Sequence, residues 1–179
     1  MATKTNLGVK YGHMSRATLY SVDEDLRLTE KPYREYRDGL ITAKSIPTKL
    51  HALVMRVLLR LLEEQGLEAY PELTLRISDS KFLVPDITVT DDFAGPYPSK
   101  PVEICCEILS PEDRLGATLG KCEEYHAWGV PFCWVIDPVK QSAWEYHANA
   151  EPFRVSEALR AGEHQIPLEP IFAAIRQAQ

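Results

Sequence analysis

The chain has 179 residues, 45% of them hydrophobic and 26% charged, which suits one globular domain with a sizeable core. Its formal net charge of −6 excludes the overall basic character of many nucleic-acid-binding domains. No apolar run approaches the roughly 20 residues of a membrane helix, and the N-terminus lacks the apolar core of a signal peptide. We therefore expect a cytoplasmic protein with no membrane partner.

The N-terminal part of the chain carries weak structural signals. Residues 1–20 show no periodicity, so we expect a flexible arm there, followed by a single domain over residues 21–179. Ser21 followed three residues later by Glu24 is a capping box, which predicts a short helix ending before Pro32.

A hairpin and a long helix come next. Residues 33–44 alternate around Asp38-Gly39, a strong hairpin signal that places Glu35 on the first strand. Residues 47–65 carry an apolar stripe at helical spacing and end before Gly66, a residue that commonly caps helices. His51 falls in the first turn, where a packing or capping role competes with a contact to substrate.

Apolar runs predict the remaining elements. Strands are expected over residues 68–77, 82–90, 102–109 and 132–136, with outer strands over 143–147 and 152–155. A helix should begin at Ser110, with its hydroxyl as the cap, and end at Gly129; a small helix should cover residues 168–175. The strand–helix–strand unit over residues 102–136 predicts a parallel crossover. The expected fold class is α/β, with a mixed β-sheet flanked by helices.

Two of these apolar strands each contain one carboxylate. Asp86 and Glu107 occupy positions where an apolar residue would pack better, and a buried carboxylate is costly unless it is paired or binds a metal. Lys121, on the following helix, could reach both carboxylates. Because Mg²⁺ commonly uses one or two carboxylates with water and substrate phosphate, this set predicts a magnesium site.

Other polar residues have simpler interpretations. Asp137, beside Pro138, is expected to be a turn carboxylate, and Glu103 to lie toward solvent outside the site. Tyr125, one turn after Lys121, could contact substrate or fill space. The four cysteines lack the spacing of a zinc site, so we expect buried free thiols.

Charge is distributed unevenly along the chain. Residues 31–60 carry seven Lys or Arg and two acidic residues, a balance of +5, whereas residues 107–124 carry five acidic and two basic residues, a balance of −3. A basic flank beside an acidic pocket suits a metal-dependent phosphodiesterase, although a solvated helix face would carry the same basic residues.

The ordered combination of these segments resembles the Uma-type family of putative restriction endonucleases, within the PD-(D/E)XK nuclease superfamily. The matching segments are Glu35 with Asp38-Gly39, His51, Pro85-Asp86, Glu107-Ile108-Leu109-Ser110-Pro111, Lys121 with Tyr125, Gly129-Val130 and Trp134-Val135-Ile136-Asp137-Pro138. The superfamily's E-X-K pattern would place lysine at Leu109, so the resemblance assigns the lysine role to Lys121.

This resemblance implies a restriction-endonuclease-like fold and a Mg²⁺-dependent DNA endonuclease, with Mn²⁺ as a possible substitute. It implies that Asp86, Glu107 and the main-chain carbonyl of Ile108 bind the metal, and that Glu35 leans toward the active site, although an exposed edge-strand carboxylate is the alternative. A homodimer is expected because duplex cleavage needs two sites. Two other functions fit the sequence: a non-catalytic DNA-binding or assembly module, and a hydrolase of small phosphoesters.

Overall fold

The computed structural model of the chain describes residues 34–92 and 94–179. The predicted arm over residues 1–20, the helix after Ser21 and the boundary between arm and domain lie outside these residues. The described strands are β1 (Arg34–Arg37), β2 (Leu40–Ala43), β3 (Ala69–Pro71), β4 (Leu75–Ser78), β5 (Lys81–Leu83), β6 (Ile87–Val89), β7 (Ile104–Ile108), β8 (Phe132–Asp137), β9 (Ser142–His147), β10 (Phe153–Val155), β11 (Ala158–Ala161) and β12 (His164–Pro167). The described helices are α2 (Lys49–Glu64), α3 (Leu115–Trp128) and α4 (Glu169–Ala178). None of these helices is long and apolar enough to cross a membrane.

Two sheets organise the described part of the chain. The larger has the strand order β10-β9-β8-β7-β6-β3, and the smaller has the order β2-β1-β5-β4. Strands β7 and β8 are parallel, whereas the other neighbours in the larger sheet are antiparallel. The sheet is therefore mixed, and the predicted α/β class and parallel crossover are confirmed.

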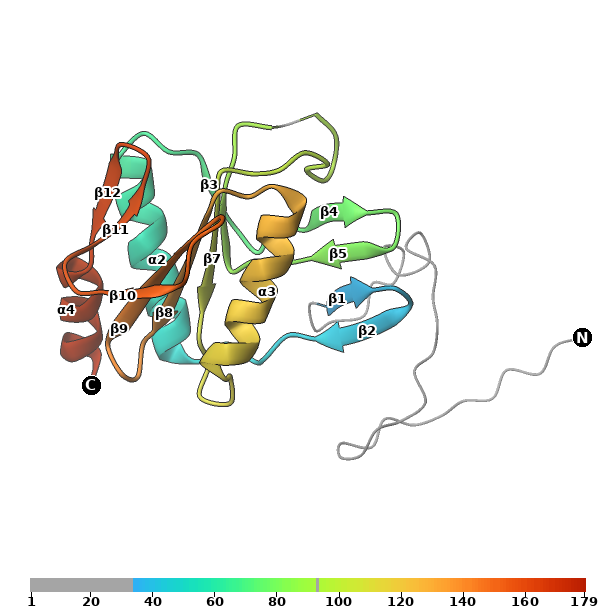
Figure 1. Cartoon of the computed structure of the whole chain (residues 1–179). Coiled ribbons are helices and arrows are strands. Elements are labelled where there is room, and N and C mark those ends of the chain that lie inside the picture. Colours follow the sequence, from blue (N-terminus) through green and yellow to red (C-terminus); the bar gives the residue numbers. More distant parts are fainter. Residues whose placement is uncertain (1–33, 93) are drawn as a thin grey trace, which may run out of the picture.

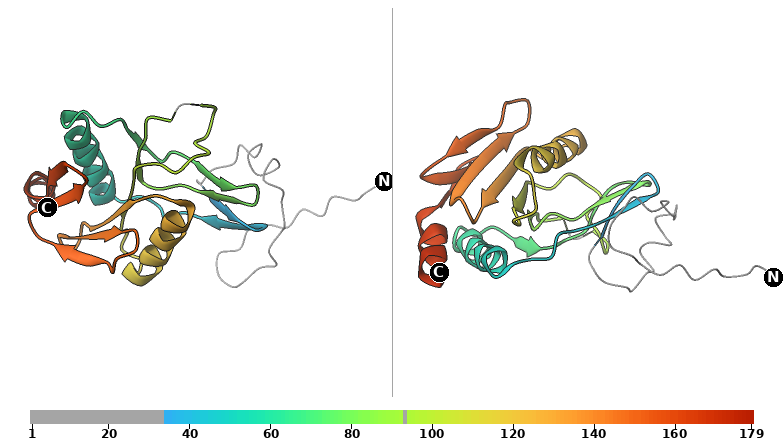
Figure 2. Two further views of the ribbon diagram at one scale, coloured as in Figure 1. Left: turned by 45° about the horizontal axis from the view of Figure 1, so that its top comes forward. Right: turned by 90° about the horizontal axis from the view of Figure 1, so that it is seen from below.

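Helices cover both faces of the six-stranded sheet. Because side chains alternate along a strand, Ile104, Cys106 and Ile108 of β7 pack with α2 and α4, while Cys105 packs with α3. Figures 1 and 2 show α2 and α4 on one side of this sheet and α3 on the other, with the four-stranded sheet beside α3. Glu107, between two residues that face α2, therefore faces α3.

The predicted hairpin and long helix are confirmed. Strands β1 and β2 pair in antiparallel register around Asp38-Gly39, where both residues have positive φ. At the start of α2, the Thr48 hydroxyl accepts a hydrogen bond of 3.2 Å from the His51 backbone N–H. His51, in this first turn, is buried.

Two predicted strands are wrong, because each divides between the two sheets. Residues 68–77 form β3 and β4, separated at Glu72, whose φ is +50°. Residues 82–90 form β5 and β6, separated by residues 84–86. Since every residue from 82 to 90 is buried, the apolar pattern continues through the link and hides the change of sheet.

Two further differences concern helix α3 and the C-terminal region. Helix α3 begins at Leu115 and its N-cap is Arg114, so the predicted start and cap at Ser110 are wrong. Asp113 instead accepts the Ser110 backbone N–H at 2.7 Å, in a turn before the helix. The β11–β12 hairpin was not predicted, because its turn at Gly162 follows a short, partly polar strand.

Gly129 ends α3 as predicted, in the left-handed region with a φ of +119°. A Cβ there would lie 2.8 Å from the Cγ atom of Pro101, whereas Gly66, with a φ of +76°, has no atom within 4 Å of its Cβ position.

Gly66→Ala should cost about 1–2 kcal/mol of backbone strain, and Gly129→Ala should cost more because Pro101 must also move. Urea unfolding followed by circular dichroism measures both variants; equal losses would show that Pro101 gives way freely.

Candidate active site

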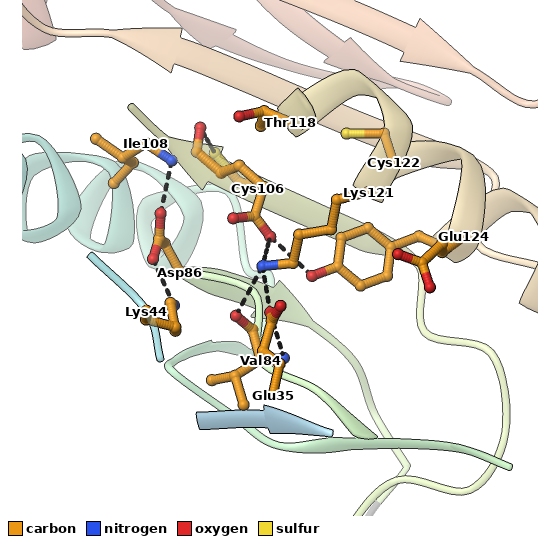
Figure 3. A network of polar contacts seen from close by, with 12 residues as sticks. Glu35, Lys44, Val84, Asp86, Cys106, Ile108, Thr118, Lys121, Cys122 and Glu124 are labelled. Atoms are coloured by element: carbon orange, nitrogen blue, oxygen red, sulfur yellow. Dashed lines mark hydrogen bonds and ion pairs between the residues drawn. The ribbon is translucent and has the colours of Figure 1, made fainter. Parts of the chain in front are cut away.

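The four predicted site residues lie together where the two sheets meet. Glu35 comes from β1, Asp86 from the link between β5 and β6, Glu107 from β7 and Lys121 from α3. All four, and Ile108, line one pocket of about 300 Å³. Figure 3 shows Glu35, Asp86 and Lys121 converging from their separate elements.

The Lys121 side chain is held by three oxygen atoms. Its Nζ lies 2.8 Å from Glu107 Oε1 and 2.5 Å from Glu35 Oε1, and it donates a hydrogen bond of 3.2 Å to the Val84 carbonyl. Burial alone would lower the pKa of Lys121, but Glu107 and Glu35 raise it above its ordinary value. Lys121 is therefore a fixed cation in the pocket.

Glu107 is buried against α3. The Tyr125 hydroxyl donates a hydrogen bond of 2.7 Å to Glu107 Oε1, the oxygen that also contacts Lys121. Burial and the nearby Asp86 raise the pKa of Glu107, while Lys121 opposes the rise. Tyr125 was expected to fill space or to contact substrate; the structure adds a further role, because its hydroxyl holds a site carboxylate.

Asp86 is contacted on both carboxylate oxygens. Oδ2 accepts the Ile108 backbone N–H at 2.7 Å and lies 3.2 Å from His51 Nε2, while Oδ1 lies 2.7 Å from Lys44 Nζ. Burial would raise the pKa of Asp86, but the hydrogen bond from His51 and the charge of Lys44 hold it well below its usual range. Asp86 is therefore ionised and rigidly oriented.

Glu35 anchors a second network around the pocket. It is buried in β1, an interior strand of the smaller sheet, so the alternative of an exposed edge-strand carboxylate is wrong. Its Oε1 accepts the Val84 N–H at 3.2 Å, and its Oε2 lies 2.9 Å from Arg37. Arg37 also bonds Glu124 of α3 at 2.9 Å, which ties β1 to the helix that supplies Lys121.

The described residues of the pocket offer two carboxylates to a cation but no larger cluster of metal-binding side chains. Among residues 34–92 and 94–179, no cluster of three or more His, Cys, Asp or Glu side chains is arranged to hold a metal. Asp86 and Glu107 instead supply two carboxylates, and Mg²⁺ is commonly held by that number of protein carboxylates with waters completing the shell.

Sequence reasoning missed two contacts of Asp86. Lys44 follows the β1–β2 hairpin, and its only signal was membership in the basic segment over residues 31–60. His51 was singled out, but its contact with Asp86 could not be predicted, because the two residues are 35 positions apart and belong to different elements.

The simpler interpretations agree with the structure. All four cysteines are buried free thiols, as expected. Asp137 Oδ1 accepts the backbone N–H groups of Val139 and Lys140, as a turn carboxylate does. Glu103 is exposed and does not line the pocket.

The described residues of the basic segment over 31–60 do not form one patch. Arg37 and Lys44 line the pocket, whereas Arg56 lies on the exposed face of α2.

Comparison with solved structures supports this fold. The chain is similar to the crystal structure of a putative nuclease belonging to DUF820 from Anabaena variabilis ATCC 29413, with a TM-score of 0.73 and 23% sequence identity over 87% of this chain and 99% of that chain. A cryo-EM structure of a DrdV–DNA complex matches with a TM-score of 0.40 and 17% identity over 69% of this chain and 10% of that chain, a level that defines no common fold.

Comparison of sequences gives the family. No curated protein matches the chain. Residues 22–178 match the sequence profile of the Uma2 family, described as putative restriction endonuclease. This match includes every residue of the pocket described above, from Glu35 on β1 to Lys121 on α3. The chain therefore belongs to the Uma2 family of putative restriction endonucleases.

Proposed function

We propose that this protein is a metal-dependent endonuclease that hydrolyses DNA phosphodiester bonds, with Mg²⁺ as cofactor and Mn²⁺ as a substitute. One observation carries the proposal: Lys121 reaches from α3 to Glu107 and Glu35 in the same pocket as Asp86. Membership in a family of putative restriction endonucleases supports the same chemistry.

Asp86, Glu107 and the main-chain carbonyl of Ile108 would hold the metal. When bound, Mg²⁺ would polarise the scissile phosphate and lower the pKa of an attacking water. The Ile108 N–H donates a hydrogen bond to Asp86, and the Tyr125 hydroxyl donates one to Glu107. Both carboxylates are therefore oriented before any ligand binds. Such preorganisation limits the reordering that metal binding requires.

Lys121 would act on the substrate as a charged donor. Phosphodiester hydrolysis accumulates negative charge on the phosphoryl oxygens and the leaving oxygen, and a fixed ammonium stabilises that charge. Glu35 would position Lys121, because it accepts a hydrogen bond from Val84 as well as contacting the ammonium. In this proposal Glu35 holds the Lys121 side chain in position and does not contact the reacting atoms.

The substrate in this proposal is DNA in the cytoplasm. Arg37, Arg114 and Thr118 line the pocket beside Lys121 and offer donors for phosphate oxygens.

Cutting both strands of a duplex requires two such sites, which favours a homodimer. Sedimentation of the protein as a monomer at cleavage-competent concentrations would contradict the dimer.

The alternative is a non-catalytic DNA-binding or assembly module that keeps the fold. The observation in its favour is that Lys44 pairs with Asp86 and Lys121 pairs with Glu107, so both carboxylates are compensated by charges of the protein itself. Supercoiled plasmid incubated with the protein and Mg²⁺, Mn²⁺ or EDTA separates the two. Metal-dependent nicking supports the endonuclease; DNA binding without cleavage under any metal supports the module.

Asp86→Asn should weaken Mg²⁺ binding strongly, because it removes a metal ligand and half of the site's carboxylate charge while preserving the side chain's shape. Loss of a direct ligand should exceed the roughly 10–100-fold cost of losing an outer-shell partner. Isothermal titration calorimetry measures the affinity. Asp79→Asn is the matched control, because that carboxylate is 98% exposed and its ion-pair partner within the described part of the chain is Arg76. Equal Mg²⁺ affinity in wild type and Asp86→Asn would exclude this arrangement of ligands.

Lys121→Met should reduce plasmid cleavage by about 10²–10³-fold, the effect of removing one charge-stabilising donor from an active site. Methionine keeps the packing of the stem, so the fold should persist, and Mg²⁺ affinity should not fall because a competing cation is removed. Cleavage rates, calorimetry and circular dichroism measure these three properties. Lys140→Met is the control, since that side chain is 76% exposed. Wild-type cleavage by a folded Lys121→Met protein would refute the lysine's role.

A further inference from the structure

The two oxygens of Asp86 are held in different ways. Oδ2 contacts the Ile108 backbone N–H and the buried His51 ring, and both partners belong to regular elements of the fold. Oδ1 contacts Lys44 Nζ, which comes from the irregular segment between β2 and α2. The fold thus fixes Oδ2, while a side chain of a loop covers Oδ1.

The two lysines of the pocket also differ in how firmly they are held. Lys121 contacts Glu107, Glu35 and the Val84 carbonyl, and it extends from the middle of α3. Lys44 has Asp86 as its one ion-pair partner among the described residues. The two side chains are similarly exposed, at 15% for Lys44 and 13% for Lys121, so they differ in the number of contacts. Breaking one contact would free Lys44, whereas three contacts hold Lys121.

Lys44 also contacts the oxygen that a cation bound to Oδ1 would use. Its Nζ is 2.7 Å from Oδ1, and Mg²⁺ binds carboxylate oxygens at about 2.0–2.1 Å. A carboxylate oxygen has room for two partners, but a divalent ion and an ammonium bound to the same oxygen repel each other. Metal binding at Oδ1 therefore weakens the contact between Asp86 and Lys44.

We infer that Lys44 is the resident counter-ion of Asp86 Oδ1 in the metal-free protein, and that a divalent cation displaces it on binding. This inference rests on the proposed metal-dependent function. It assigns Oδ1 as the metal-facing oxygen of Asp86 and Oδ2 as the oxygen that the fold holds. Lys44 keeps the buried Asp86 carboxylate compensated until metal arrives, so the metal-free pocket stays folded, and metal affinity is lowered by the cost of breaking the pair.

Chemical labelling of lysines tests the exchange on the unmodified full chain. Reductive methylation with formaldehyde and a borane reductant, followed by peptide mass spectrometry, gives a rate for each lysine. The reaction is run in EDTA, in saturating Mg²⁺ and in NaCl of equal ionic strength. We expect methylation of Lys44 to rise severalfold in Mg²⁺ alone. Lys140, exposed, and Lys121, held by two carboxylates, are internal references whose rates should not change.

Two variants sharpen the measurement. In Asp86→Asn, Lys44 should be methylated quickly already in EDTA and should not respond to Mg²⁺. Lys44→Met should bind Mg²⁺ more tightly than wild type by calorimetry, whereas Lys49→Met, which removes a neighbouring exposed charge, should bind as wild type does. Both readouts are independent of DNA cleavage.

The outcomes distinguish the inference from the function on which it rests. Binding of Mg²⁺ to wild type with an unchanged Lys44 methylation rate overturns the exchange and leaves the endonuclease proposal intact. Failure of both Mg²⁺ and Mn²⁺ to bind overturns the metal site and the exchange together. Binding accompanied by release of Lys44, with Lys121 still protected, supports the assignment of Oδ1.

Discussion

Burying the Lys121 ammonium between two carboxylates constrains three separate parts of this fold. An unpaired charge in such a site costs several kcal/mol, so α3 must stay close enough to β7 for Lys121 to reach Glu107, and to β1 for it to reach Glu35. The bridge from Arg37 to Glu124 enforces the second distance. The smaller sheet is thereby attached to α3 by charge as well as by apolar packing, since Leu75 of β4 and Leu83 of β5 share a buried cluster with Cys122 and Tyr125 of α3.

The link over residues 84–86 performs two tasks at once. It carries the chain from β5 in one sheet to β6 in the other, and its backbone serves the site, because Val84 donates to Glu35 and accepts from Lys121. Asp86 extends the same function: its carboxylate caps the Ile108 N–H, and its carbonyl accepts the Glu72 N–H at 3.0 Å. The segment that joins the sheets thus also supports the site: Asp86 lines the pocket, and Val84 contacts Glu35 and Lys121.

Local patterns predicted the elements but not the division of strands between sheets. The long helix, the hairpin and the crossover were predictable because periodicity and turn residues are local signals. The break at residues 84–86 was not, because burial is continuous from residue 82 to residue 90 and removes the alternation that would mark a strand end. Asp86 and Glu107 could be singled out because a carboxylate buried in an apolar strand is costly unless it has a partner. Lys44 gave no comparable signal, because a lysine in a polar loop is ordinary and its partner lies 42 residues away.

The role proposed for Lys121 can be served from a helix because the helix and the strand position at Leu109 face the same side of β7. Leu109, where the E-X-K pattern would place lysine, lies two residues after Glu107, and side chains two apart on a strand share a face. Leu109 packs there with Cys122 and Tyr125 of α3. A helix packed on that face can therefore place an ammonium beside Glu107, as α3 does with Lys121, whose Nζ lies 2.8 Å from Glu107 Oε1. An apolar residue then fills the strand position. What the proposed chemistry requires is the position of the charge beside the carboxylate, and in this chain α3 supplies it.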